Sequence, residues 1–253
     1  MHHLILTAIA FLLVLIVAAP DARAQQSSPS LSPAQKEEVE SLIGDYIRKN
    51  PQIILEAIEI LKQQERQAQE DRVSAALARL QDQLIKEASS PVGGNPDGDV
   101  TIVEFFDYRC GYCKKVLPAI VALLERDKKL RYVFKELPIL SPESELAARA
   151  ALAAWRLDRG KYLAYHTALM QAQGNLSERR ILRLARNAGL DSEKIAKDMK
   201  HPKVEEELKR NIAMAEQLGI RGTPAFIIGD RVIPGAVDLT MLEKTVAEVR
   251  KKK

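Results

Sequence analysis

The chain is poor in cysteine and in aromatic residues. Its 253 residues include two cysteines and one tryptophan, and aromatic residues make up 5% of the total. Two cysteines are too few for a disulfide-rich miniprotein or for a four-thiolate zinc site. The charged fraction of 28% excludes a protein with many membrane-spanning helices, and the hydrophobic fraction of 46% is too high for a wholly disordered chain. Both cysteines lie in one window, Cys110-Gly111-Tyr112-Cys113, so any cysteine chemistry of this chain occurs there.

Long uncharged apolar stretches are scarce, and the one at residues 4–19 is followed by Ala22-Arg23-Ala24. This tripeptide fits the small-x-small pattern that precedes a signal-peptide cleavage site. A retained membrane anchor would need roughly 17 to 25 apolar residues, slightly more than this stretch provides. We therefore interpret residues 1–24 as a secretory signal peptide and expect the mature chain to be exported to a compartment where disulfides form and exchange.

The charge distribution argues against nucleic-acid binding. The chain carries 38 Lys and Arg and 34 Asp and Glu, a formal net charge of +4, and the basic excess lies after residue 90. The basic residues are spread out and are not interleaved with aromatic residues. This pattern is typical of a solvated surface, so no nucleic-acid partner is expected.

Residues 25–90 have the pattern of a helical arm. After a short Gln-, Ser- and Pro-rich stretch, Ser32, Pro33 and Gln35 form a capping-box arrangement that begins a helix. Asn50-Pro51 ends that helix, and the absence of Gly and Pro from residues 53–88 predicts a second, long helix.

The second predicted helix carries two short apolar seams separated by a polar segment. The seams have 4-3 spacing and consist of Ile54, Ile58 and Leu61, and of Val73, Leu77, Leu80 and Leu84. They fall short of the continuous heptads of a long coiled coil. The arm could fold back on its own domain or serve as an oligomerisation stalk, and we favour self-association because an arm with apolar seams must bury them somewhere.

The remaining residues, 91–253, predict an α/β domain. Residues 89–99 contain two prolines and three glycines, which is typical of a linker. The pattern then predicts a strand at 100–106, a helix at 113–126, a strand at 130–139, a helical region at about 141–218, a hairpin at 225–233 and a helix at 238–250. The first strand-helix-strand unit implies a parallel strand pair.

The cysteine pair follows a strand directly and begins a helix. Backbone N–H groups at a helix N-terminus stabilise a thiolate, so Cys110 is the candidate attacking sulfur and Cys113 the candidate resolving thiol. A structural disulfide would close too short a loop to stabilise the fold much. Zinc would need further ligands, and His166 and His201 are isolated residues that we expect at the surface or as helix caps. Cu(I) could bind the two thiolates, so that alternative stays open.

These features together resemble the DsbA-like thioredoxin-fold family of exported thiol-disulfide oxidoreductases, over about residues 98–250. The resemblance rests on the strand VTIVEFF, the motif CGYC, the inserted helices, and Gly222-Thr223-Pro224 before a hairpin. It implies that Cys110 and Cys113 are the redox pair, that Pro224 is a cis-proline facing it, and that the Thr223 backbone pairs with bound substrate. Gly111 and Tyr112, between the cysteines, are then expected at the substrate-binding surface.

Glu104 matches a buried acid beneath the redox pair in that family. Strand alternation places it on the same face as Ile102 and Phe106, among apolar neighbours. The resemblance suggests proton exchange with Cys113. The alternative is an acid at a solvated strand end.

The N-terminal segment, with YIRKNPQIILEAIEIL, is similar to that of the suppressor-of-copper-sensitivity C (ScsC) branch of DsbA-related proteins. Some members of that branch are trimers and disulfide isomerases, whereas others are monomers. The CGYC motif and the Thr before the proline also resemble isomerase sites. The motif lacks the histidine found in strongly oxidising members.

The sequence thus predicts a thioredoxin fold with an inserted helical subdomain, preceded by a helical arm. The expected activity is that of a periplasmic protein disulfide isomerase or reductase without a cofactor. Its partners would be disulfide-containing proteins, a membrane-embedded thiol reductase and further copies of the chain, with a trimer favoured. A DsbA-type dithiol oxidase, a periplasmic Cu(I)-binding protein involved in copper tolerance, and a binding module with an inert cysteine pair are the alternatives.

Overall fold

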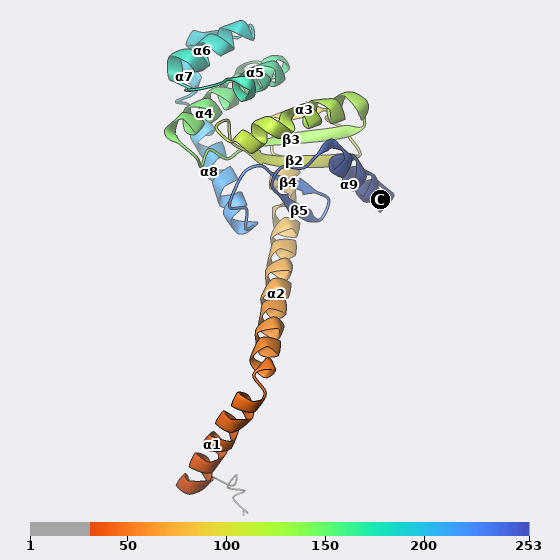
Figure 1. Ribbon diagram of the computed structural model, residues 1–253. Coiled ribbons are helices and arrows are strands. Elements are labelled where there is room, and N and C mark those ends of the chain that lie inside the picture. The colour runs from red at the N-terminus through yellow and green to blue at the C-terminus, as the bar shows by residue number, and fades with distance from the viewer. Residues whose placement is uncertain (1–30, 253) are drawn as a thin grey trace, which may run out of the picture. The chain divides into compact units, whose positions relative to one another are not determined.

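The computed structural model describes residues 31–252, so the predicted signal peptide lies outside the described residues. The chain divides into two compact units, residues 1–60 and 61–253, with the boundary inside helix α2 (Gln52–Ile85). Figure 1 shows the elements of both units. Within the described range, the helices are too short or too polar to cross a membrane.

The first unit contains α1 (Pro33–Lys49) and the beginning of α2. The predicted capping box is present: the Ser32 hydroxyl accepts from Gln35 N at 3.3 Å, and Ser32 N donates to Gln35 Oε1 at 2.9 Å. Asn50 caps the C-terminus of α1. The local sequence signals therefore placed both ends of α1 correctly.

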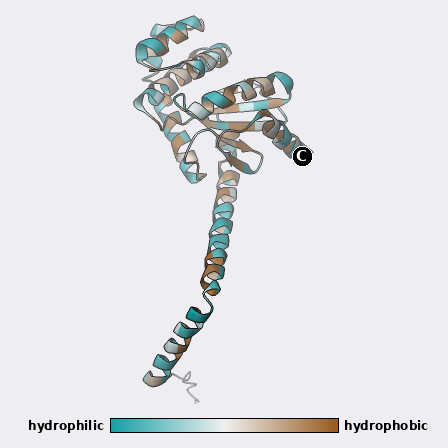
Figure 2. Cartoon of the chain, in the orientation of Figure 1, coloured by the Kyte–Doolittle hydropathy of each residue, from teal (hydrophilic) through white to brown (hydrophobic). Residues whose placement is uncertain are grey.

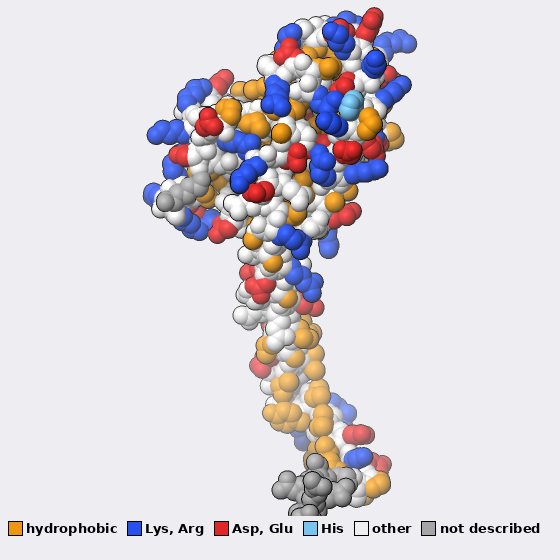
Figure 3. Space-filling view, turned by 180° about the vertical axis from the view of Figure 1, so that it is seen from behind, with side chains coloured by type: hydrophobic (Ala, Val, Ile, Leu, Met, Phe, Trp, Pro, Cys, Tyr) orange, Lys and Arg blue, Asp and Glu red, His pale blue; other side chains and the backbone are white. Residues whose placement is uncertain are grey.

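Along α1 and the start of α2, most apolar side chains are exposed rather than packed. No residue of α1 is buried. Figure 3 shows hydrophobic side chains gathered along this part of the chain, and the cartoon in Figure 2 marks hydrophobic residues at the start of α2. The exposed members are Val39, Leu42, Ile43, Tyr46, Ile47, Ile54, Leu55, Ile58 and Ile60. A contiguous apolar surface of this kind is characteristic of a protein interface.

The second unit contains a five-stranded sheet with the order β1-β3-β2-β4-β5. The strands are β1 (Val92–Gly94), β2 (Val100–Phe106), β3 (Leu130–Glu136), β4 (Ala225–Ile228) and β5 (Arg231–Pro234). β2 and β3 are parallel, as predicted, and the other pairs are antiparallel. The mixed sheet and its helices confirm the predicted thioredoxin fold.

β1 corrects the prediction that residues 89–99 are only a linker. This strand pairs with β3 in the register Val92↔Val133. Its sequence, Val-Gly-Gly, has a single β-branched residue, so it carries almost no local strand signal. A side chain would be tightly packed here, because a Cβ on Gly93 would lie 3.0 Å from the Phe134 ring. A long-range contact, rather than propensity, makes this segment a strand.

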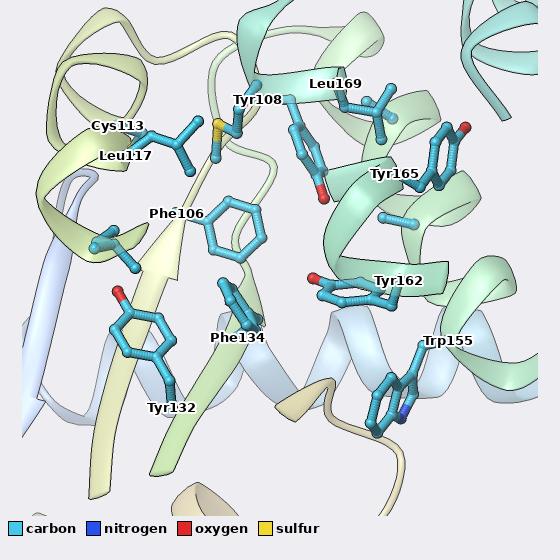
Figure 4. Packing of buried hydrophobic residues seen from close by; sticks show 14 of the residues in the cluster. Phe106, Tyr108, Cys113, Leu117, Tyr132, Phe134, Trp155, Tyr162, Tyr165 and Leu169 are labelled. Atoms are coloured by element: carbon cyan, nitrogen blue, oxygen red, sulfur yellow. The ribbon is translucent and has the colours of Figure 1, made fainter. Parts of the chain in front are cut away.

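One face of the sheet is covered by α3 (Gly111–Arg126) and α9 (Leu239–Lys251), which belong to a large apolar core. Figure 4 shows how aromatic rings from β2, β3 and the inserted helices meet in this core. Phe106 lies edge-on to Phe134, with ring centroids 6.1 Å apart, and Tyr132 lies 4.9 Å from the Phe134 ring. The predicted alternation along β2 is confirmed, because Ile102 and Phe106 point into this core.

The opposite face of the sheet packs against the C-terminal part of α2 and against α8 (Pro202–Gln217). Leu80 and Leu84 of α2 are 3% and 2% exposed and belong to the same cluster as Val103 and Phe105. The sequence analysis favoured self-association for both seams of this helix. The structure corrects that prediction for the second seam, whose leucines cover the chain's own sheet. The sequence could not distinguish the two uses, because burial against a sheet and against another helix produces the same spacing.

The helical region between β3 and β4 consists of several short helices. They are α4 (Pro142–Leu157), α5 (Arg159–Gln171), α6 (Glu178–Asn187), α7 (Ser192–Asp198) and α8. His201 caps α8, with Nδ1 accepting from Lys203 N at 3.1 Å, as expected for a capping histidine. His166 is instead 1% exposed in the aromatic core, so the expectation of a surface or capping position is wrong for that residue.

We expect Leu80→Ala to lower the free energy of unfolding of the second unit by about 2–4 kcal/mol, because it removes a buried side chain between α2 and the sheet. Gln63→Ala, at an exposed position of the same helix between the two seams, serves as the control. Urea unfolding followed by Trp155 fluorescence measures both. Equal, small effects of the two substitutions would contradict the packing of α2 described above.

Candidate functional site

The two cysteines lie where β2 ends and α3 begins. Cys110 is the N-cap residue of α3, and its Sγ accepts a hydrogen bond from Cys113 N at 3.4 Å. A side chain at this position faces the unpaired N–H groups and the positive end of the helix dipole. The local geometry therefore favours negative charge on the Cys110 sulfur over the Cys113 sulfur.

Asp107 holds the loop that carries Cys110, a role that the sequence analysis missed. Its side chain is 1% exposed and accepts three backbone hydrogen bonds. Oδ1 accepts from Arg109 N at 2.7 Å, and Oδ2 accepts from Ile139 N at 3.0 Å and Leu140 N at 3.1 Å. The first bond is an Asx-turn, which the sequence could have suggested; the other two join the ends of β2 and β3 and depend on the fold.

The two free thiols differ in burial and in electrostatic environment. Cys110 is 6% exposed and Cys113 1% exposed. Burial raises the pKa of the Cys113 thiol well above its usual range, and the Glu104 carboxylate raises it further. Cys113 is therefore held as a protonated thiol.

Between the cysteines, Tyr112 is 66% exposed, and a Cβ on Gly111 would meet no atom within 4 Å, so this dipeptide lies at the surface.

The segment that begins β4 lies directly beside Cys110. The Thr223–Pro224 peptide bond is cis, as the resemblance implied. The Cys110 thiol donates to the Thr223 carbonyl oxygen, with 3.1 Å between sulfur and oxygen. The register Phe105↔Ala225 between β2 and β4 produces this contact. The structure thus brings Cys110, Cys113, Thr223 and Pro224 together in one site.

Glu104 lies beneath the cysteines in the middle of β2 and is 1% exposed. Tyr132 donates its hydroxyl hydrogen to Oε2 at 2.9 Å, whereas Oε1 is buried without a hydrogen-bond partner. Burial raises the pKa of Glu104 to about 8, although the Tyr132 hydrogen bond acts in the opposite direction. The carboxyl group can therefore gain or lose a proton near neutral pH.

A second buried polar cluster lies in the aromatic core, and the sequence analysis did not identify it. Glu136 Oε1 accepts from the Tyr108 hydroxyl at 3.1 Å and from the Tyr162 hydroxyl at 3.4 Å. The Tyr108 oxygen also lies 3.0 Å from His166 Nδ1. Burial raises the pKa of Glu136 well above its usual range and lowers that of His166 to about 3, so the histidine is uncharged at neutral pH. Tyr108 thus anchors the chain two residues before Cys110.

No metal centre is evident in the part of the chain that the structure describes. Within residues 31–252, no three His, Cys, Asp or Glu side chains are grouped so that they could hold an ion. A soft metal at the cysteine pair would therefore have to rely on the two sulfurs alone.

We expect Glu104→Gln to raise the free energy of unfolding relative to wild type, by an amount that grows as the pH rises. The pKa of Glu104 is about 8 in the folded state and about 4.5 ordinarily, so the folded protein binds this proton more tightly than the unfolded chain does. Wild type therefore loses stability between about pH 4.5 and pH 8, by up to about 5 kcal/mol at about 1.4 kcal/mol per pKa unit. The variant lacks this loss. Urea unfolding at pH 5, 6.5 and 8 measures it, and parallel pH profiles for the two proteins would contradict the burial of an ionisable carboxyl group.

Comparison with known proteins supports the assignment made from the fold. Residues 101–247 match the model of the DSBA-like thioredoxin domain family, and residues 35–68 match that of the copper resistance protein ScsC N-terminal domain. Among curated sequences, Na(+)/H(+) antiporter NhaA 1 of Salinispora arenicola is 29% identical over 157 residues, which are 61% of this chain. The aligned part spans only 24% of that antiporter.

Two solved structures resemble this chain over nearly the whole of their own length. A thioredoxin-like oxidoreductase from Silicibacter pomeroyi is 44% identical with a TM-score of 0.64, covering 67% of this chain and 97% of that one. Proteus mirabilis ScsC in a transitional conformation is 35% identical with a TM-score of 0.67, covering 88% and 100%. The family match thus covers more than half of the chain, and the ScsC similarity extends to its N-terminal helices. The chain belongs to the DSBA-like thioredoxin family, in its ScsC branch.

Proposed function

We propose that this protein is an exported thiol-disulfide oxidoreductase that isomerises or reduces disulfides in other proteins. The observation that carries the proposal is the position of Cys110, whose Sγ lies between the Cys113 N–H and the Thr223 carbonyl oxygen, at the start of a helix and beside a cis-proline. The proposed location is the periplasm, after removal of residues 1–24.

In the first step, the Cys110 thiolate attacks one sulfur of a substrate disulfide. The substrate S–S bond breaks, an S–S bond to Cys110 forms, and the released substrate thiolate takes up a proton. Thr223 and Pro224 are the proposed backbone contacts of the bound segment, and Gly111 and Tyr112 offer an open surface for the approaching polypeptide.

The mixed disulfide then has two fates. A substrate thiolate can attack it, which forms a different substrate disulfide and returns Cys110 to the reduced state. Alternatively, Cys113 attacks Cys110, which releases the substrate as a dithiol and leaves the enzyme oxidised by two electrons. Because burial holds Cys113 protonated, the second route requires removal of its proton first.

Glu104 is the proposed acceptor of that proton. It is buried beneath the pair, its carboxylate interacts electrostatically with Cys113, and its pKa of about 8 permits proton exchange near neutral pH. Slow deprotonation of Cys113 lengthens the life of the mixed disulfide, which favours rearrangement by substrate thiols. The absence of a histidine between the cysteines removes a further stabiliser of the thiolate and argues against a strongly oxidising DsbA-type dithiol oxidase.

An isomerase must be kept reduced, so we propose a membrane-embedded thiol reductase as a partner. The same two sulfurs offer a soft Cu(I) site, and the match of residues 35–68 to a copper resistance protein domain favours copper tolerance as a second candidate role. Copper and a disulfide compete for the same pair, so the two roles are exclusive at any moment.

We further propose that the arm predicted at residues 25–90 mediates oligomerisation through α1 and the start of α2, with a trimer favoured. The exposed apolar residues of the first unit support this proposal, since Leu42, Tyr46 and Leu55 are each at least 60% exposed. Their burial between copies would surround one client protein with several redox sites and exclude small oxidising partners.

The full-length mature protein should restore activity to a scrambled multi-disulfide protein in a glutathione buffer. Cys110→Ser should abolish both this activity and the reduction of insulin, because the attacking sulfur is lost. Cys113→Ser, the matched variant, should abolish insulin reduction and accumulate the mixed disulfide, while it retains part of the isomerase activity. Rapid oxidation of reduced substrate without any reshuffling would instead identify a dithiol oxidase.

The mature protein should sediment and scatter light as an oligomer, and Ile54→Lys combined with Ile58→Lys should convert it to a monomer by placing charges in the exposed seam. Gln63→Lys with Gln67→Lys introduces the same charges at the same spacing, at exposed positions outside the seam, and should leave the mass unchanged. A monomer mass for the wild type would disprove the oligomerisation arm.

A further inference from the structure

Three basic side chains gather beside the redox pair, and neither the sequence predictions nor the mechanism above gives them a role. Arg109 directly precedes Cys110, and Lys114 lies about one helical turn after Cys110, in the first turn of α3. The third, Arg180, belongs to α6 in the inserted helical region. The cluster therefore joins the redox loop to a part of the chain that is distant in sequence.

All three side chains meet at the loop between α5 and α6. Their hydrogen-bond acceptors are backbone carbonyl oxygens of this loop: Lys114 donates to Ala172, Arg109 to Gly174, and Arg180 to Gln173 and Asn175. Carbonyl oxygens orient a cationic side chain but carry no net charge. The loop thus fixes the positions of three cations without neutralising them.

The positive charge of the cluster is balanced in part by a single acid. Glu143 Oε2 lies 3.1 Å from Arg109 Nε, whereas Lys114 and Arg180 form no ion pair with any residue of the described range. Burial lowers the pKa of Lys114, and the nearby charges of Arg109 and Arg180 lower it further. The fold therefore holds like charges together against their mutual repulsion, and a bound anion would relieve that repulsion.

The three side chains remain accessible to a ligand. The Arg109 side chain is 32% exposed, and Lys114 and Arg180 are half-buried. An ammonium group has three N–H donors and a guanidinium group has five. The loop contact uses one donor of Lys114, and the two contacts of Arg180 come from a single nitrogen. Donors are therefore left for further acceptors.

The redox reaction itself determines which anions reach this surface. A partner that forms a disulfide with Cys110 brings the residues next to its own cysteine to the start of α3, and one residue of extended chain spans about 3.3–3.6 Å. The anionic side chains of a polypeptide are those of Asp and Glu, and guanidinium and ammonium groups form strong charge-assisted hydrogen bonds with carboxylates. The chemistry of the cluster therefore fits a partner with acidic residues beside its cysteine.

We propose that Arg109, Lys114 and Arg180 form a carboxylate-binding surface that favours partners with acidic residues next to the reacting cysteine. This proposal rests on the proposed function, since it names a substrate class for the same redox pair. The surface acts during approach, because attraction between opposite charges raises the rate of encounter before the S–S bond forms. Through Arg180, the inserted helical region takes part in the choice of substrate.

The test uses the full-length Cys113→Ser protein, in which Cys110 is the remaining thiol. Three otherwise identical peptides carry one cysteine flanked by two Glu, two Gln or two Lys, each as a mixed disulfide with pyridine-2-thiol. The Cys110 thiolate attacks the peptide sulfur, a new S–S bond forms, and pyridine-2-thiolate leaves and takes up a proton. Its release is followed by absorbance.

We expect the Glu peptide to react about 5-fold faster than the Gln peptide at an ionic strength of about 0.1 M, and the Lys peptide to react more slowly than both. At about 1 M the Glu-to-Gln rate ratio should fall below about 2, because the screening length shrinks from about 10 Å to about 3 Å. The Gln peptide reports the reactivity of the Cys110 sulfur itself, so the ratio is independent of any change in that reactivity.

Lys114→Gln and Arg180→Gln should each lower the ratio to about 2, and the double variant should lower it to about 1. Each substitution removes one charge and keeps an amide donor for the loop carbonyls. The two residues belong to different helices, so a shared effect does not arise from one local folding defect.

Lys128→Gln is the matched control and should keep the 5-fold ratio. It removes the same charge at an exposed position beyond the opposite end of α3, a helix of 16 residues. At 1.5 Å per residue this helix is about 24 Å long, more than twice the screening length at about 0.1 M.

A ratio near 1 in the parent protein, a ratio that the double variant leaves unchanged, or an equal fall in Lys128→Gln would overturn the carboxylate-binding surface. A Cys110 thiol that reacts with none of the three peptides would instead overturn the proposed redox function.

Discussion

The pairing of β2 with both β3 and β4 is the constraint on which the site depends. The parallel register Phe106↔Glu136 and the antiparallel register Phe105↔Ala225 bring three chain ends to one edge of the sheet. The loop with Cys110, the turn after β3 and the cis-proline segment meet there, and Asp107 joins the first two through backbone hydrogen bonds. A register shift of one residue in β4 would reverse its side chains and remove the Thr223 carbonyl from Cys110.

The difference between the two sulfurs follows from this arrangement. Cys110 lies at the open end of α3, where backbone N–H groups face it, whereas Cys113 is one turn deeper, in a medium of low polarity with a carboxyl group beneath it. Burial favours the uncharged forms of both Cys113 and Glu104. Transfer of the Cys113 proton requires Glu104 as the carboxylate, so the step moves one negative charge from the carboxylate to the sulfur and adds no second charge to the core.

The sequence was most informative where a feature is local. Ser32 and Asp238 were correctly identified as helix caps, and the cysteine motif and Gly229-Asp230 correctly marked a helix start and a hairpin. The failures all involve contacts between distant residues. β1 forms by pairing with β3, and His166 is buried because its helix crosses the aromatic core; neither property has a local signature.

α2 shows how one amphipathic pattern serves different purposes along a single helix. Its first seam has Ile54 and Ile58 exposed, whereas its second buries Leu80 and Leu84 under the sheet. Residues 62–72, between the seams, are polar apart from Ala68, so the apolar surfaces are separate and can be altered independently. A substitution at Leu80 therefore tests packing against the sheet and one at Ile54 tests the proposed self-association, so the two properties of the helix can be assigned to different residues.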